Sequence, residues 1–158
     1  MEGVKVVDSE VLQEVRFKVL WPHLSFAEEA VIDIDKSDGA VHLASYQDEE
    51  VVGVASLFAQ QCERYPDVFP DKKAYRLRAM GVLDSVRGSG VGAQIINRAV
   101  ELLKEKGVEV LWCDAREVAW GFYLKQGFKF AEDCEGYECE AYELRNVGLH
   151  KMMYFYIT

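Results

Sequence analysis

A glycine-rich segment, residues 86–92, lies between a strand-like run and a long amphipathic helical pattern, and it constrains the fold more than any other feature. The run before it covers residues 74–82, and the pattern after it predicts a helix over about 91–106. A glycine-rich turn that opens a helix presents backbone N–H groups without intrahelical partners, and the helix dipole adds positive potential there. Because glycines let a ligand approach the backbone and Arg87 adds a positive charge, we expect a phosphate-bearing ligand at this loop.

Two ligand classes fit the spacing of these glycines. Gly88, Gly90 and Ala93 match the dinucleotide-binding fingerprint, and Asp114 follows after about one more strand, as that fingerprint requires. However, residues 83–87 separate the loop from its strand, and few residues follow Asp114 to supply the further parallel strands of such a fold. A P-loop is excluded because the segment has no Gly-Lys-Ser/Thr sequence.

The second spacing, Arg87-x-x-Gly90-x-Gly92, resembles the pyrophosphate-binding loop of the GNAT superfamily, the acyl-CoA-dependent N-acetyltransferases. A second segment is similar to that superfamily's A-x-x-x-Y-x-x-x-G-F signature through Ala119, Tyr123, Gly127 and Phe128. The two signatures occur in the expected order. The resemblance covers roughly residues 75–130 well and the rest of the chain more loosely.

The resemblance implies an α+β GNAT fold: a mixed, mainly antiparallel sheet with a splayed central parallel pair and helices on both faces, in a single domain over residues 1–158. Local patterns agree, since residues 40–46 and 51–59 predict an antiparallel hairpin and residues 75–112 predict a strand–helix–strand unit with parallel strands. The resemblance also implies that acetyl-CoA is the co-substrate. The residues implied to bind it are Met80, Gly81, Val82, Arg87, Gly88, Ser89, Gly90, Val91 and Gly92.

For catalysis, the resemblance implies that Tyr123 is the general acid that protonates the departing thiolate. It does not assign a general base. His42 and His150 are the candidates, because histidine is suited to proton transfer near neutral pH. The competing interpretations are a core tyrosine for Tyr123 and hydrogen-bonded structural histidines for the other two.

A subgroup of GNAT proteins resembles the chain more closely, in the stretches 16–20, 76–80, 112–116 and 148–152 and in a histidine at position 42. Asp114 departs from that subgroup, which tends to have asparagine there, and Trp21 replaces its usual arginine. Within the second stretch, Arg76 or Arg78 could anchor a substrate carboxylate, or each could form an ion pair with one of the abundant glutamates.

Further local patterns predict the remaining elements. Asp8 or Ser9 should cap a helix that ends before Pro22, and residues 23–35 should hold a second short helix. Residues 108–112 predict a buried strand, and Asp114 with Glu117 predicts a capping box at the start of the next helix. Strands are also expected at residues 4–7, at Phe128 and over 150–157.

The 158 residues are 50% hydrophobic, enough for one sizeable core. A net charge of −9, from 18 basic and 27 acidic residues, disfavours nucleic-acid and anionic-membrane partners. The sequence shows no signal peptide and no membrane-spanning run, so we expect a cytoplasmic protein. The four cysteines form no C-x-x-C pair, which disfavours a metal site and favours reduced thiols; Cys113 is expected to be a small buried residue rather than a nucleophile.

The expected function is therefore transfer of an acetyl group from acetyl-CoA to a primary amine of a small molecule or peptide. The alternatives are a non-catalytic acyl-CoA-binding module and a dinucleotide-binding protein. The acidic stretch 132–143 either attracts a cationic acceptor or is a solvated loop. A homodimer is compatible with the sequence.

Overall fold

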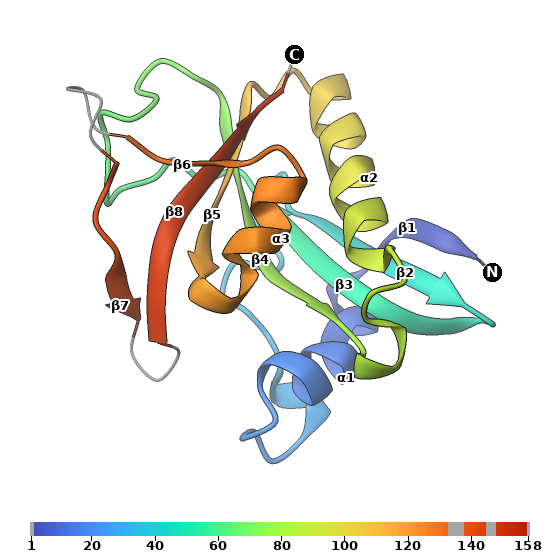
Figure 1. The fold of residues 1–158 in the computed structure, drawn as a ribbon. Helices are drawn as coiled ribbons and strands as arrows, with labels where there is room; N and C mark the ends of the chain where they lie inside the picture. The colour runs from blue at the N-terminus through green and yellow to red at the C-terminus, as the bar shows by residue number, and fades with distance from the viewer. Residues whose placement is uncertain (1, 133–137, 145–147, 158) are drawn as a thin grey trace. The chain divides into compact units, whose positions relative to one another are not determined.

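The computed structural model describes residues 2–132, 138–144 and 148–157 (Figure 1). The chain forms two compact units: residues 1–59 with 77–102 make the first, and residues 60–76 with 103–158 make the second. Strand β4 (Ala74–Val82) and helix α2 (Val91–Glu105) both contribute residues to each unit. None of the helices in the described ranges has the length and apolar character that a membrane crossing requires.

The first unit is built on three antiparallel strands, β1 (Gly3–Val7), β2 (Val41–Gln47) and β3 (Glu50–Phe58), with β2 in the middle. Asp48 and Glu49 form the tight turn between β2 and β3, with positive φ angles of 51° and 68°. That hand of turn matches the twist of the two strands it joins. The predicted hairpin is confirmed, with each bound shifted by one residue.

The N-terminal helical segment is irregular. It begins as a 3₁₀ turn, η1 (Ser9–Leu12), continues as one turn of α1 (Gln13–Val15) and ends as a π turn, η2 (Arg16–Leu20). The N–H of Trp21 donates to the carbonyl of Arg16 at 2.9 Å, a bond across five residues that defines a π turn. The sequence pattern predicted an ordinary helix here, because its apolar spacing does not distinguish these helix types.

The apolar spacing Val11, Leu12, Val15 and Val19 predicts one buried face for this segment, and the structure confirms it in part, since Val11 is exposed. Leu12 and Val15 are buried against Ala44 of β2 and Val54 of β3. Asp8 takes the N-cap position, but its side chain makes no capping hydrogen bond. The second short helix predicted for residues 23–35 is reduced to a single 3₁₀ turn, η3 (Ala27–Glu29).

Helix α2 lies very close to strand β3 at Gly53. A Cβ atom on Gly53 would lie 2.9 Å from Ile95 Cδ1 and 2.9 Å from Val91 Cγ1, so no larger residue fits there without a shift. Val91 and Ile95 are buried, as expected for one face of the predicted amphipathic helix. Gly107, with a φ of +76°, ends the helical region in a left-handed conformation.

The second unit is centred on β5 (Val110–Arg116) and β8 (Gly148–Tyr156), which pair antiparallel. The first three residues of β4 pair in parallel with residues 110–112 of β5. Both strands continue beyond this pairing, β4 to Val82 and β5 to Arg116. The short strands β6 (Lys129–Phe130) and β7 (Tyr142–Leu144) pair with β8.

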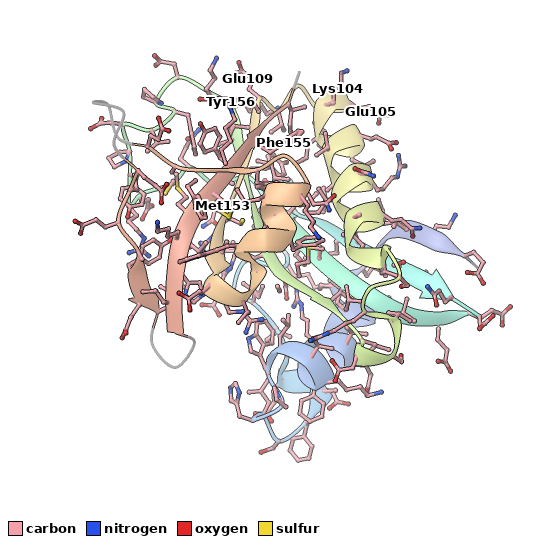
Figure 2. All side chains as sticks on the ribbon, in the orientation of Figure 1. Lys104, Glu105, Glu109, Met153, Phe155 and Tyr156 are labelled. Carbon is pink, nitrogen blue, oxygen red and sulfur yellow. The ribbon has the colours of Figure 1, made fainter. Side chains whose placement is uncertain are left out.

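Each face of the second unit's sheet is covered by apolar side chains. Trp112 and Met152 are buried on one face together with Phe69 from the loop 60–73. Met153 and Phe155, labelled in Figure 2, alternate with these residues along β8. The ring of Phe155 lies 5.6 Å from that of Phe128, which follows helix α3 (Trp120–Lys125).

The predicted helix cap at Asp114 is wrong. Strand β5 extends to Arg116, beyond the predicted end at residue 112, so Asp114 lies inside the strand. The helical region starts only with the 3₁₀ turn η5 (Glu117–Ala119), and neither it nor α3 has a side-chain cap. The carboxylate of Asp114 instead accepts hydrogen bonds from Arg76 and Tyr142, which are distant in sequence.

The fold class predicted from the sequence is confirmed. Most strand pairs are antiparallel, β4 and β5 form the parallel pair, and helices flank the sheet. The described residues follow the predicted order of elements, from the hairpin through the glycine-rich loop and α2 to the final strand.

Candidate functional site

The glycine-rich loop connects β4 to α2 in the first unit. A 3₁₀ turn, η4 (Asp84–Val86), follows the strand, and Leu83 N–H bonds to the carbonyl of Val52 at 2.9 Å. Gly88 and Gly90 then have φ angles of +79° and +89°, which glycine adopts without strain. A Cβ atom at either glycine would meet no other atom within 4 Å, so there is open space beside this backbone.

The N–H groups of this loop are largely unpaired. Ser89 N–H donates to the carbonyl of Val86 at 3.2 Å, and Gln94 N–H makes the first helical bond, to Gly90 at 3.0 Å. Five further N–H groups donate to no backbone carbonyl of the described residues. They belong to Gly88, Gly90, Val91, Gly92 and Ala93. Such a group of donors at the start of a 15-residue helix is suited to an anion.

Two side chains of the loop carry further polar groups. The exposed guanidinium of Arg87 lies beside Asp84, with Nε 3.1 Å from Oδ1. This pair is exposed, so a stronger anion can replace the aspartate at little cost. The hydroxyl of Ser89 donates to the carbonyl of Val86 and thereby fixes the turn.

The end of β4 contains an unusual backbone. Ala79 has a φ of +52°, in the left-handed region that residues with a Cβ rarely adopt. Two residues later, a Cβ atom on Gly81 would lie 3.2 Å from side-chain atoms of Val19 and Leu20, so the π turn packs tightly against this glycine. The conformation of Ala79 has no signal in the sequence, because alanine is not a residue that indicates positive φ.

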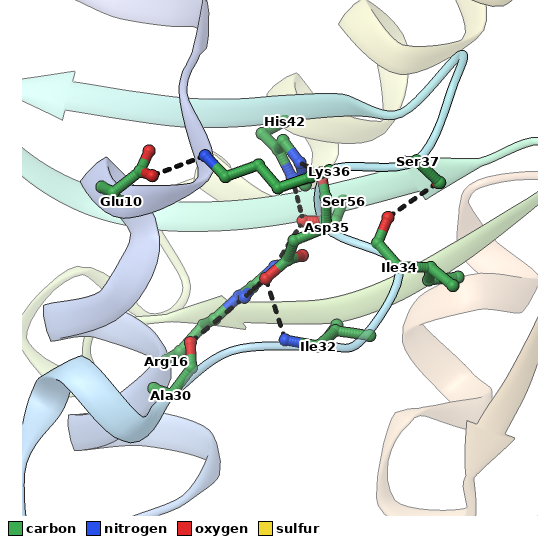
Figure 3. Close-up of polar contacts among 10 residues, drawn as sticks. All are labelled: Glu10, Arg16, Ala30, Ile32, Ile34, Asp35, Lys36, Ser37, His42 and Ser56. Carbon is green, nitrogen blue, oxygen red and sulfur yellow. Dashed lines mark hydrogen bonds and ion pairs between the residues drawn. The ribbon is translucent and has the colours of Figure 1, made fainter.

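A buried ion pair anchors the π turn to the rest of the first unit (Figure 3). Arg16 Nη1 and Nη2 donate to Asp35 Oδ2 and Oδ1 at 2.8 Å and 2.9 Å. The same guanidinium also donates to the hydroxyl of Ser56 and to the carbonyl of Ala30, at 2.8 Å and 3.1 Å. Arg16 is fully buried, and Asp35 is the counter-ion of its charge, while its Nε has no hydrogen-bond partner among the described residues.

His42 belongs to the same network. Its Nε2 lies 2.8 Å from the carbonyl oxygen of Asp35, which can only accept, so Nε2 carries the proton (Figure 3). Its Nδ1 lies 2.8 Å from the hydroxyl of Ser56 and therefore accepts from it. Both ring nitrogens are engaged, and the imidazole is buried. This geometry favours the structural interpretation of His42 over the general base.

Tyr123 lies in α3 of the second unit and is 8% exposed. The centre of its ring lies 5.2 Å from that of Phe122 and 5.1 Å from that of Phe128. Its side chain is also hydrogen-bonded to that of Cys113. Burial, together with the neighbouring Cys113 side chain, raises the pKa of Tyr123 well above its ordinary value. The phenol therefore keeps its proton, although the raised pKa also makes it a weaker acid than an exposed tyrosine.

His150 lies in β8 of the second unit and is buried. Its Nδ1 lies 2.7 Å from the carbonyl oxygen of Gly148, so Nδ1 carries the proton and Nε2 keeps its lone pair. Among the described residues, no hydrogen bond occupies Nε2. The ring stacks on Tyr142 with an interplanar angle of 20°. His150 thus has the tautomer that a general base requires, whereas His42 does not have a free acceptor nitrogen.

Asp114 organises the polar residues of the second unit. Arg76 Nη2 donates to its Oδ2 at 2.6 Å, and the hydroxyl of Tyr142 donates to its Oδ1. Burial and this bond to Asp114 both raise the pKa of Tyr142. Sequence reasoning singled out Arg76 but not Tyr142, because Tyr142 lies in the irregular acidic stretch, which carries no motif.

The other candidate groups show no sign of reactivity. Among the described residues, no cluster of His, Cys, Asp and Glu is able to hold a metal ion. Cys62, Cys113 and Cys139 are unbridged and buried, and Cys134 lies outside the described residues. Burial raises the pKa of the Cys113 thiol, which argues against a thiolate nucleophile. Residues 133–137 of the acidic stretch also lie outside the described residues.

The chain is similar to known acetyltransferases in sequence and in structure. Residues 9–128 match the model of the Acetyltransferase (GNAT) family. The chain is 32% identical over 154 residues, which is 98% of its length and 95% of the relative's, to the uncharacterized N-acetyltransferase YitI of Bacillus subtilis (strain 168).

Solved structures share the fold at much lower identity. A putative N-acetyltransferase from Lactobacillus plantarum is 15% identical, with a TM-score of 0.71 and 99% of each chain covered. An aminoglycoside 6'-N-acetyltransferase complexed with coenzyme A is 14% identical, with a TM-score of 0.68 and coverage of 98% of this chain and 97% of that one. From the family match and the relative, the chain belongs to the GNAT family of acetyltransferases.

Proposed function

We propose that this protein transfers an acetyl group from acetyl-CoA to a primary amine of a small molecule or peptide. The observation that carries the proposal is the glycine-rich loop, where unpaired N–H groups and open space at Gly88 and Gly90 occur together at the start of α2. A similar fold is reported in complex with coenzyme A, in the aminoglycoside 6'-N-acetyltransferase. The identity of that enzyme's acceptor does not carry over to this chain at 14% identity.

The residues of the loop fit the pyrophosphate of coenzyme A. The backbone of Gly88, Ser89, Gly90, Val91 and Gly92 would donate to its oxygens, and Arg87 would exchange its exposed partner Asp84 for the phosphate charge. A side chain at Gly90 would fill the space that the diphosphate needs. No residue of the loop introduces a carboxylate after Asp84.

The backbone at Met80, Gly81 and Val82 would hold the pantetheine arm and the acetyl carbonyl. The left-handed Ala79 just before these residues interrupts the regular strand conformation, and irregular strand backbone presents groups for a ligand. Acetyl-CoA supplies the activated acetyl thioester when bound. An N–H group from this strand end would polarise the thioester carbonyl.

Two side chains of the second unit would move protons. The lone pair of the amine nitrogen forms the bond to the carbonyl carbon as the C–S bond breaks. His150 Nε2 would accept the proton that the amine loses, and Tyr123 would donate a proton to the departing sulfur. His42 has a different part in the proposal: it holds Ser56 and the carbonyl of Asp35, and so positions the segment around Arg16.

A thiol-release assay with acetyl-CoA and a panel of primary amines, amino acids and peptides tests the proposal. An acetyltransferase releases free coenzyme A with at least one acceptor faster than in its absence. A non-catalytic acyl-CoA-binding module would bind acetyl-CoA without acceptor-dependent release. A dinucleotide-binding protein would bind NAD and not coenzyme A, which calorimetry with the two ligands distinguishes.

A further inference from the structure

An arginine in the second unit, Arg64, lies over the ring of Tyr142, whose hydroxyl binds Asp114. The guanidinium carbon of Arg64, in the loop 60–73, is 3.8 Å from the centre of the Tyr142 ring. The same ring stacks on His150 with 6.4 Å between ring centres. Arg64 and His150 therefore both lie within 6.4 Å of the centre of one tyrosine ring.

The tyrosine ring is held rigidly by its hydroxyl, which donates to Asp114. Asp114 is itself fixed by the 2.6 Å bond from Arg76, whose guanidinium lies 4.9 Å from the centre of the Trp112 ring. Because the ring of Tyr142 cannot easily turn, it offers a fixed surface on which a guanidinium can stack.

The two arginines differ in what they have left to bind. Arg76 forms an ion pair with Asp114, so its carboxylate partner belongs to this chain and not to a substrate. Arg64 is exposed, and no carboxylate of the described residues lies within ion-pair distance of it. A guanidinium stacked on a ring through its face keeps its N–H groups along its edge for a second partner.

We propose that Arg64 binds a carboxylate of the acceptor, so that the acceptor class is an amine that also carries a carboxylate, as in an amino acid. This inference rests on the proposed acetyltransferase function and on His150 as the base. The carboxylate would bind to the edge of the guanidinium, in the two-point geometry that arginine favours. The amine of the same acceptor would then lie near the imidazole of His150, which stacks on the ring of Tyr142.

The local charge supports an anionic rather than a cationic group at this position. Among the side chains joined by these contacts, the guanidiniums of Arg64 and Arg76 outnumber the carboxylate of Asp114, and both oxygens of Asp114 are engaged by Arg76 and Tyr142. A polyamine at this position would meet an unneutralised guanidinium. The overall charge of −9 therefore does not decide the charge of the acceptor.

The test compares L-amino acids with their C-terminal amides as acceptors in the thiol-release assay. The pair differs only in the carboxylate, so the ratio of their kcat/KM values measures its recognition. We expect the wild-type protein to prefer at least one amino acid over its amide by about 10-fold or more, the effect of a hydrogen bond to a charged group. In Arg64→Gln the preference should fall toward 1, through a higher KM for the amino acid and an unchanged KM for acetyl-CoA.

Matched variants separate this role from a structural one. Arg98→Gln removes an exposed arginine of α2 that pairs with Glu101, and it should leave the preference unchanged. Arg64→Lys keeps the charge but not the planar stack, and it should restore only part of the preference.

Three results would overturn the inference. The first is equal or better activity with the amides, and the second is an Arg64→Gln variant with an unaltered preference. The third is a protein that binds acetyl-CoA and acetylates amines without a carboxylate, but no amino acid. A protein that does not bind acetyl-CoA at all would instead refute the proposed function on which the inference rests.

Discussion

Arg16 and Asp35 form a buried two-point ion pair, with side-chain exposures of 0% and 6% and Nη–Oδ distances of 2.8 Å and 2.9 Å (Figure 3). The pair joins the π turn to the segment that precedes β2. The last two residues of that turn, Val19 and Leu20, pack against Gly81 of the proposed pantetheine-binding backbone. The ion pair therefore holds in place the turn that packs against Gly81.

Replacing Asp35 by asparagine should destabilise the protein strongly. The change leaves the charge of Arg16 buried without a counter-ion, which typically costs about 3–5 kcal/mol. Urea unfolding of Asp35→Asn and wild type measures the difference. Lys36→Ala is the matched control, because it removes the neighbouring exposed ion pair with Glu10 and should leave the unfolding midpoint nearly unchanged. A difference below about 1 kcal/mol for Asp35→Asn would contradict the role of the pair.

The same pair predicts how stability depends on pH. Burial alone would raise the pKa of Asp35, but the hydrogen bonds from Arg16 and from the N–H of Ile32 outweigh it and lower the pKa below its ordinary 3.8. A carboxyl whose pKa is lower in the folded state stabilises the protein at pH values above 3.8. That stabilisation is lost as the pH falls through the lower folded-state pKa.

Unfolding free energies measured between neutral pH and the acid range test this dependence. The wild type should lose stability steeply below the ordinary pKa of aspartate, and Asp35→Asn should show a shallower slope, since it lacks the titrating group. Parallel slopes for the two proteins would show that Asp35 does not titrate differently on folding.

Tyr123→Phe should slow the reaction without weakening acetyl-CoA binding. The substitution keeps the ring and its packing on Phe122 and Phe128 but removes the proton donor. We expect kcat to fall by about 10²-fold when chemistry is rate-limiting, the usual contribution of a general acid. Tyr65→Phe, which removes a hydroxyl bonded to the carbonyl of Glu140, is the control and should keep wild-type turnover. Wild-type turnover in Tyr123→Phe would reduce Tyr123 to a core residue.

His150→Gln should change the pH profile as well as the rate. Without a base, the amine must arrive already deprotonated, so the remaining activity should rise more steeply with pH than that of the wild type. We expect a loss of about 10²-fold in kcat near neutral pH, recovered in part under alkaline conditions. His23→Gln, at an exposed histidine, is the control. A uniform loss at every pH would indicate a structural role for His150.

The sequence predicted the elements that local patterns define. The bounds of β4 and the start of α2 at Val91 agree with the structure, because periodicity and the glycines around residue 90 mark them locally. The roles of Asp114 and His42 were not predictable in this way. Asp114 binds Arg76 and Tyr142, 38 and 28 residues away, and His42 binds Ser56, 14 residues away across a hairpin. Such contacts follow from strand register, which one sequence does not encode as a motif.

The Gly90→Val variant tests the central claim, that the glycine-rich loop binds coenzyme A, and isothermal calorimetry with acetyl-CoA is the measurement. A branched side chain would fill the open space at this glycine, and we predict binding at least about 10-fold weaker than wild type, as expected for the loss of a charge-assisted hydrogen bond. Gly107→Val is the matched control, because Gly107 also has a positive φ and open space but lies at the other end of α2; its affinity should equal that of wild type. A folded Gly90→Val protein that binds acetyl-CoA with wild-type affinity would show that coenzyme A does not bind at this loop.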